Sequence, residues 1–198
     1  MGAHVILFGH CGCWVPPRVG RSSIGIGSIH WLDSGREMAA KLHHLSLPSG
    51  LLERGFWLYV WKVEIPGGGV VHYVGMTGDT STYNPQSPFK RAADHLGFND
   101  NSNPLRRYLR ERGHDLENCK ALDLVAYGPI YEVPQEQGAY SPVRGKVAAL
   151  EKALCGGLRA AKYEVVHADP GCRFEYEPAK WSEVRAAFAE HFPELLRQ

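Results

Sequence analysis

The sequence has little excess charge of either sign. Its 22 Lys and Arg face 21 Asp and Glu, which leaves a formal net charge of +1. It also has few cysteines, and their number, five, is odd. A general polyanion-binding surface therefore cannot be inferred from the total charge, and a disulfide framework is not indicated. Cys119, Cys155 and Cys172 are scattered without metal-ligand spacing, so we expect reduced thiols.

A long hydrophobic run is also missing. The apolar stretch HVILF near the N-terminus is too short to cross a bilayer and lacks the flanks of a signal peptide. We therefore expect no membrane partner and predict a cytoplasmic protein. His10, Cys11 and Cys13 are candidate zinc ligands, but no second ligand pair with zinc-finger spacing follows them, so a zinc site is the weaker interpretation.

Apolar residues make up 44% of the chain, close to the globular average, while Gly and Pro are somewhat enriched. Neither disorder nor a repeat architecture is indicated. We predict three parts: an N-terminal arm over residues 1–52, a folded domain over 53–170, and a C-terminal helix within 171–198. Inside the arm, Ser34 is the predicted N-cap of a helix that reaches Leu45.

A β-hairpin is the clearest local prediction. The stretches FWLYVWKVEI and VVHYVGM are rich in aromatic and β-branched residues, and PGGG between them supplies a turn. Tyr59 and Tyr73 lie near the middle of this hairpin. The stretch ALDLVAY at 121–127 is predicted as a third strand.

Four helices are predicted beyond the arm. Two short ones share the same signals of N-cap, first-turn proline and glycine stop: Ser87, Pro88 and Gly97, then Asn103, Pro104 and Gly113. A longer helix over 143–162 carries an apolar stripe, with Glu151 at the edge of that stripe. The tail predicts a packing helix through Trp181, Val184, Phe188 and Phe192.

Basic residues gather between Lys90 and Arg112, where six basic residues face three acidic ones. Such a stripe is a candidate polyanion contact, and equally an ordinary solvated helix face. The sequence alone leaves both interpretations open.

In chain order, a hairpin, a helix pair, a strand and a long helix carry Tyr59, Tyr73, Arg91, His95 and Glu151. This order resembles the GIY-YIG nuclease family over residues 56 to 168. The paired motifs correspond to WLY at 57–59 and YVG at 73–75, and further matches are RAADH at 91–95 and LEKAL at 150–154. Two departures stand out: Trp57 and Leu58 replace the glycine and isoleucine of the first motif, and His167 stands near the family's usual asparagine.

The resemblance implies an α+β fold with a small antiparallel sheet of about three strands, flanked by helices. It also implies hydrolysis of phosphodiester bonds in DNA with Mg²⁺ or Mn²⁺ as cofactor. Glu151 would hold the metal, Arg91 would donate to phosphate, and Tyr59 would act as base with Tyr73 orienting the water or phosphate. His95 would be the alternative base. Further substrate contacts are expected from six residues: Thr77, Lys90, Arg106, Arg107, Arg110 and His167.

Three hypotheses follow. The first is a metal-dependent DNA endonuclease, with restriction-type cleavage by a homodimer as one form of it. The second is a nucleic-acid-binding module of the same fold that has lost turnover. The third is an accidental resemblance, since tyrosines in hairpins, Arg and His four residues apart, and a lone helical Glu usually have ordinary packing or surface roles. The third hypothesis predicts that Tyr59, Tyr73, Arg91 and Glu151 do not converge in space.

Overall fold

The computed structural model describes residues 40–78, 83–98, 103–166 and 171–197. The chain divides between His44 and Leu45, and the sheet and helices described below lie in the second unit, Leu45–Gln198. The candidate zinc ligands lie outside the described residues, as does most of the helix predicted in the arm.

The described end of that predicted arm helix, residues 40–45, has no helical structure, which corrects the prediction. Leu42 is 99% exposed and Leu45 is 76% exposed. A short helix in water depends on burial of its apolar face, and these two leucines bury almost nothing. The first regular element is a 3₁₀ turn, η1, at Ser49–Leu52.

The predicted hairpin is present. Strands β1 (Leu58–Glu64) and β2 (Val70–Met76) pair antiparallel across their full length. Their turn contains Gly67, Gly68 and Gly69, all with positive φ, a conformation that side chains other than glycine's disfavour. The third predicted strand is also present as β3 (Ala121–Tyr127), antiparallel to β1 on its other side.

A fourth strand corrects the prediction of an antiparallel sheet of about three strands. Strand β4 (Glu164–Val165) pairs parallel to β2, so the sheet is mixed and has the order β3-β1-β2-β4. Two residues are too few to display the alternation that reveals a strand in sequence. Their pairing with Val71 and His72 depends on tertiary placement of the chain after the long helix.

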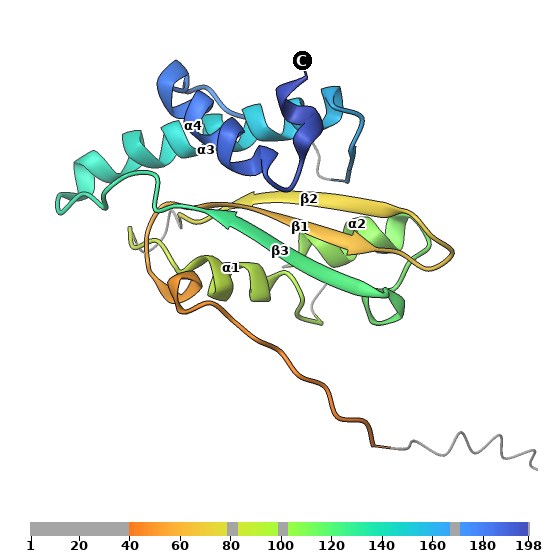
Figure 1. Ribbon diagram of the computed structural model, residues 1–198. Helices are drawn as coiled ribbons and strands as arrows, with labels where there is room; N and C mark the ends of the chain where they lie inside the picture. Colours follow the sequence, from red (N-terminus) through yellow and green to blue (C-terminus); the bar gives the residue numbers. More distant parts are fainter. Residues whose placement is uncertain (1–39, 79–82, 99–102, 167–170, 198) are drawn as a thin grey trace, which may run out of the picture. The chain divides into compact units, whose positions relative to one another are not determined.

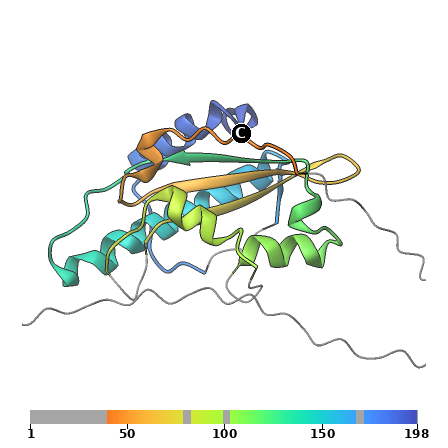
Figure 2. The ribbon, with the colours of Figure 1, turned by 90° about the horizontal axis from the view of Figure 1, so that it is seen from below.

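Helices cover both faces of the sheet, giving an α+β fold (Figures 1 and 2). Helices α1 (Pro88–Asp94) and α2 (Pro104–Glu111), with the 3₁₀ turn η2 (Leu116–Asn118), lie on one face. Helices α3 (Gln137–Ala160) and α4 (Pro178–Ala189), with η3 (Pro193–Leu196), lie on the other. In the described part of the chain, none of these helices has both the length and the apolar character needed to cross a membrane.

Alternation along β1 divides the core into two clusters. Leu58 and Val60 pack with the apolar stripe of α3 and with α4, whereas Tyr59, Trp61 and Val63 face α1 and α2. Successive side chains of a strand point to opposite faces, so Tyr59 is directed away from α3 by the strand itself. As predicted for the tail, Val184 and Phe188 of α4 are buried in the first cluster, with Trp181 partly buried beside them. Phe192 is buried there too, but α4 ends at Ala189 and Phe192 precedes η3, which corrects the prediction that the helix runs through it.

The two short helices begin at the predicted prolines, but their caps differ. The Ser87 hydroxyl accepts from the Lys90 amide at 3.2 Å, as an N-cap does. The Asn103 side chain makes no such cap and donates to the Gly97 carbonyl at 2.7 Å, tying the start of α2 to the end of α1. Helix α3 begins at Gln137 and contains Pro142, so it starts six residues before the predicted Val143.

We expect removal of residues 1–44 to leave cooperative thermal unfolding intact, with a Tm close to that of the full chain. The reason is that both core clusters are built from residues between Phe56 and Leu195. Calorimetry of the full and shortened chains would measure this. Loss of a cooperative transition in the shortened chain would show that the removed segment belongs to the core.

Candidate active site

A pocket of about 300 Å³ lies beside the end of β2 that β4 does not cover. Strand β4 pairs only with Val71 and His72, and among the described residues no strand continues the sheet beside 73–76. At this open edge, side chains from both faces of the sheet reach one space. The lining residues are Tyr59, Tyr73, Gly75, Met76, Gly78, Arg91, His95, Arg144, Ala148, Glu151 and Gly171.

The five residues that the sequence marks for catalysis, Tyr59, Tyr73, Arg91, His95 and Glu151, all line this pocket. They come from β1, β2, α1 with its C-cap, and α3, and span 93 positions of the chain from first to last. The convergence is contrary to what an accidental resemblance predicts. Most of them are also buried, with Arg91 as the exposed member at the rim.

The spacing of the hairpin motif has a packing reason. Tyr59 lies directly opposite Gly75 in the antiparallel register, and its ring lies across the glycine backbone. A Cβ atom on Gly75 would overlap that ring. Side chains two residues apart on a strand point to the same face, so Tyr73 lies on the face of Gly75. Because Tyr59 is opposite Gly75, both tyrosines lie on that face. The tyrosine pair and the glycine thus form one packing unit.

Tyr59 is hydrogen-bonded to His95. Its hydroxyl lies 2.7 Å from His95 Nε2, and both side chains are almost completely buried. The Tyr73 ring also packs on the imidazole, with ring centroids 4.9 Å apart. His95 follows the last turn of α1, four residues after Arg91, so one short helix presents both groups to the pocket.

Burial raises the pKa of both tyrosines. Desolvation is the largest cause at Tyr59, followed by the neighbouring Tyr73, while Arg91 acts in the opposite direction through its charge and a hydrogen bond. Desolvation also dominates at Tyr73, followed by the charge of Glu151. Both groups are therefore neutral phenols near pH 7 in the free protein. In the tautomer that leaves Nε2 unprotonated, the Tyr59 hydroxyl donates its hydrogen bond to His95 Nε2.

Glu151 is the acidic residue of the pocket. Burial raises its pKa from 4.5 to about 7, and the charges of Arg144 and Arg91 limit the rise. It is 9% exposed, beside the buried apolar stripe of α3 that the sequence predicted. A carboxyl group with such a pKa exchanges its proton near neutral pH and can give it up to a bound cation.

The pocket fits a cation that binds together with phosphate rather than a cation held in a full protein cage. In the described residues, no group of three or more His, Cys, Asp or Glu side chains is arranged to hold a metal. Mg²⁺ commonly takes one or two protein carboxylates, keeps several waters and binds substrate phosphates. A single carboxylate from Glu151 meets that requirement.

Arg144 is a lining residue that sequence reasoning missed. Its Nε donates to the Gly78 carbonyl at 2.9 Å, and its charge lowers the pKa of Glu151. It precedes Glu151 by seven residues, two turns of α3, and so lies on the same side of the helix. Arg144 lies inside the helix predicted over 143–162, so this spacing is visible in the sequence, but the apolar stripe alone does not point to it.

Two of the predicted substrate contacts are structural instead. Thr77 is fully buried; its hydroxyl accepts from the Trp57 amide at 2.8 Å and donates to the Gly55 carbonyl. Arg106 is 3% exposed and donates to the Leu96 and Gly97 carbonyls and to Glu117. Neither side chain is available to a ligand.

Three other predicted substrate contacts lie outside the pocket. Lys90, Arg107 and Arg110 are exposed or partly exposed and pair with carboxylates of Asp94, Glu111 and Asp115 at 2.6, 3.9 and 3.6 Å. These pairings reduce the charge of the basic stripe, which favours its interpretation as a solvated helix face. His167 lies outside the described residues.

We expect Glu151→Gln to stabilise the metal-free protein more at pH 8 than at pH 5. The raised pKa means that the folded state holds the proton of Glu151 more tightly than the unfolded chain does. The stability from that protonation is complete below pH 4.5 and is lost as pH rises to about 7, by up to roughly 3 kcal/mol. Glutamine loses no proton and escapes this loss.

Denaturant unfolding at both pH values, with a chelator present, measures the difference. Glu183→Gln, an exposed carboxylate on α4, is the matched control and should keep the wild-type pH dependence. Equal effects of Glu151→Gln at pH 5 and pH 8 would contradict the burial of an ionisable group at this position.

Comparison with protein-family models, curated proteins and solved structures finds no significant match for this chain. The relation to the GIY-YIG nucleases therefore stays a prediction from its motifs.

Proposed function

We propose that the protein is a metal-dependent nuclease that hydrolyses phosphodiester bonds in DNA at the pocket beside β2. The observation that carries this proposal is the convergence of Tyr59, Tyr73, Arg91, His95 and Glu151 on one pocket. Cleavage of duplex DNA by a homodimer, with one pocket for each strand, is the restriction-type form of the proposal.

The charges of the pocket suit a phosphodiester. Arg91 and Arg144 supply planar guanidinium donors, which match the geometry of phosphate oxygens. Because negative charge grows on those oxygens in the transition state, fixed cationic donors lower the barrier. A divalent cation held by Glu151 would add further charge neutralisation and would acidify water.

The proton of the attacking water has a path through Tyr59. As the water oxygen bonds to phosphorus, the bond to the leaving sugar oxygen breaks, and that oxygen keeps the electron pair and takes a proton from solvent. The water proton passes to the Tyr59 hydroxyl oxygen. The Tyr59 proton passes to His95 Nε2, 2.7 Å away. Because the pKa of Tyr59 is raised, a free tyrosinate is disfavoured, and His95 is the better final acceptor. This refines the expectation that Tyr59 alone is the base.

A binding module without turnover is the second candidate, and one observation favours it. Two arginines and a largely protonated carboxyl at slightly acidic pH would hold a phosphate without any metal. The same substitutions that test catalysis separate the two candidates, because the module would bind DNA and never cut it.

We expect Tyr59→Phe to lower the rate of plasmid nicking by roughly 10²- to 10⁴-fold, because the relay loses its hydroxyl while the ring still packs on Gly75. His95→Gln should cause a similar loss, and the double variant should be little worse than either single one. Tyr163→Phe is the control, since Tyr163 packs on His72 and does not line the pocket. Wild-type rates in both single variants would exclude the relay.

We expect Glu151→Gln to abolish nicking while DNA binding persists or strengthens, since the variant keeps Arg91 and Arg144 and loses a negative charge. A gel assay with and without Mg²⁺ would measure nicking and mobility shift together. Binding should weaken as salt rises, because phosphate contacts release counterions. Glu183→Gln is the matched control on α4. Nicking at the wild-type rate by Glu151→Gln would show that this carboxylate is not the metal ligand.

A further inference from the structure

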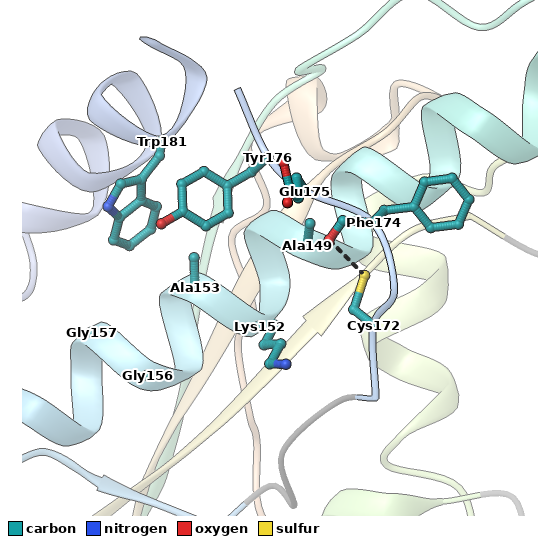
Figure 3. Close-up of a pocket in the computed structure, with 10 residues that line it drawn as sticks. All are labelled: Ala149, Lys152, Ala153, Gly156, Gly157, Cys172, Phe174, Glu175, Tyr176 and Trp181. Carbon is teal, nitrogen blue, oxygen red and sulfur yellow. Dashed lines mark hydrogen bonds between the residues drawn. The ribbon is translucent and has the colours of Figure 1, made fainter. Parts of the chain in front are cut away.

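A second and larger cavity, of about 580 Å³, lies on the outward side of α3 (Figure 3). Its floor is made of small residues of α3, namely Ala149, Ala153, Gly156 and Gly157. Its walls are the segment 172–176 and the first turns of α4. This volume is in the range of ligand sites, and the roles described so far do not use it.

Aromatic rings form one wall of this cavity. Figure 3 shows the Tyr176 ring beside the indole of Trp181, and their ring centroids lie 6.0 Å apart at 50°. Tyr176 is 40% exposed and Phe174 is 52% exposed. The Trp181 indole is half-buried and packs on the floor, where a Cβ on Gly157 would come within 3.4 Å of its ring. Partly exposed aromatic rings beside small residues suit a planar ligand.

The large cavity is linked to the candidate active site by a cavity that shares lining residues with both. A third cavity of about 330 Å³ lies between them. It shares Arg144, Ala148 and Gly171 with the active-site pocket, and it shares Cys172 and Phe174 with the large cavity. The three cavities follow one another along α3, and we call them together the α3 groove.

The groove also carries positive charge. Arg144, Arg173 and Lys152 line it in succession, and Glu175 is the acidic side chain of its two outer cavities among the described residues. A surface that combines cationic side chains with aromatic rings is the kind that single-stranded nucleic acid prefers, because phosphates contact the cations while bases stack on the rings. A duplex keeps its bases stacked on each other, so it cannot use these rings.

We propose that the α3 groove binds the unpaired nucleotides of a substrate strand that continues from the scissile phosphate, with bases stacking on Tyr176 and Trp181. This inference rests on the proposed nuclease function and narrows its substrate class to DNA with a single-stranded tail or flap beside the cleavage point. Lys152 and Arg173 contact the phosphates of that tail.

The first test measures binding apart from cleavage. Full-length protein with a chelator present is titrated with a labelled oligothymidylate of about 12 nucleotides, and both anisotropy and tryptophan fluorescence are followed. Tyr176→Ala should weaken binding roughly ten- to hundredfold. Phe98→Ala, an exposed aromatic outside the groove, is the matched control and should bind as the wild type does.

Tryptophan fluorescence shows whether the oligonucleotide binds beside Trp181. Bases stacked on Trp181 should quench its emission, and Trp181→Phe should remove that quench while keeping most of the affinity, because a stacking ring remains. Lys152→Gln should make the salt dependence of binding shallower by about 0.7 in log–log slope, whereas Lys120→Gln, an exposed lysine outside the groove, should not.

The second test compares cleavage of a tailed duplex with that of a blunt duplex of the same sequence. The wild type should prefer the tailed substrate, and Tyr176→Ala should lose the preference while cutting the blunt duplex as before.

If the wild type cuts both substrates equally and Tyr176→Ala binds the oligonucleotide normally, the nuclease proposal stands and the groove inference fails. If binding depends on Tyr176 but nothing is cut, the groove is supported and the nuclease proposal fails. Quenching by free nucleosides without affinity for the oligonucleotide would assign the cavity to a small molecule and overturn the inference.

Discussion

The candidate active site depends on the close approach of the Tyr59 ring to the backbone of Gly75. Because the ring lies flat across the neighbouring strand, its hydroxyl is carried to the edge of the sheet, where His95 meets it from α1. Any side chain at position 75 would displace the ring and break that hydrogen bond. The absence of a side chain at Gly75 thus allows the orientation of the phenol, and that orientation allows the hydrogen bond to His95 at the end of α1.

Desolvation is the second constraint on the pocket. It raises the pKa values of Tyr59, Tyr73 and Glu151 together, so near pH 7 the free protein holds both tyrosines as neutral phenols and Glu151 as a partly protonated carboxyl group. Arg91 and Arg144 oppose that effect without abolishing it. A cation that binds beside Glu151 would therefore displace a proton from its carboxyl group. An anion in the pocket would lie near the guanidinium groups of Arg91 and Arg144. The burial of these ionisable groups lowers the stability of the free fold, a cost that is common at functional sites.

Much of the fold was predictable because its signals are local. Aromatic and β-branched runs around PGGG specify the hairpin, and Pro88 and Pro104 mark the starts of two helices. The failures involve residues whose roles are set by distant neighbours. Strand β4 exists only through its pairing with β2, and Arg106 is buried because carbonyl groups at the end of α1 accept from it. A basic residue on an amphipathic helix gives no local sign of whether its partner is a phosphate or the protein's own backbone.

Helix α3 shows how one element can serve two chemistries. Its large residues, Val147, Leu150, Leu154 and Leu158, pack on the sheet, while alanines and glycines occupy the opposite side. Glu151 sits at the boundary, close enough to the core to be desolvated and close enough to the pocket to meet a ligand. Lys152 is rotated by about 100° from it and lines the outer cavity. The distribution of side-chain size around this helix therefore sets both the environment of the acid and the floor of the groove beyond it, so a change that enlarges the small face would close the groove without touching the pocket.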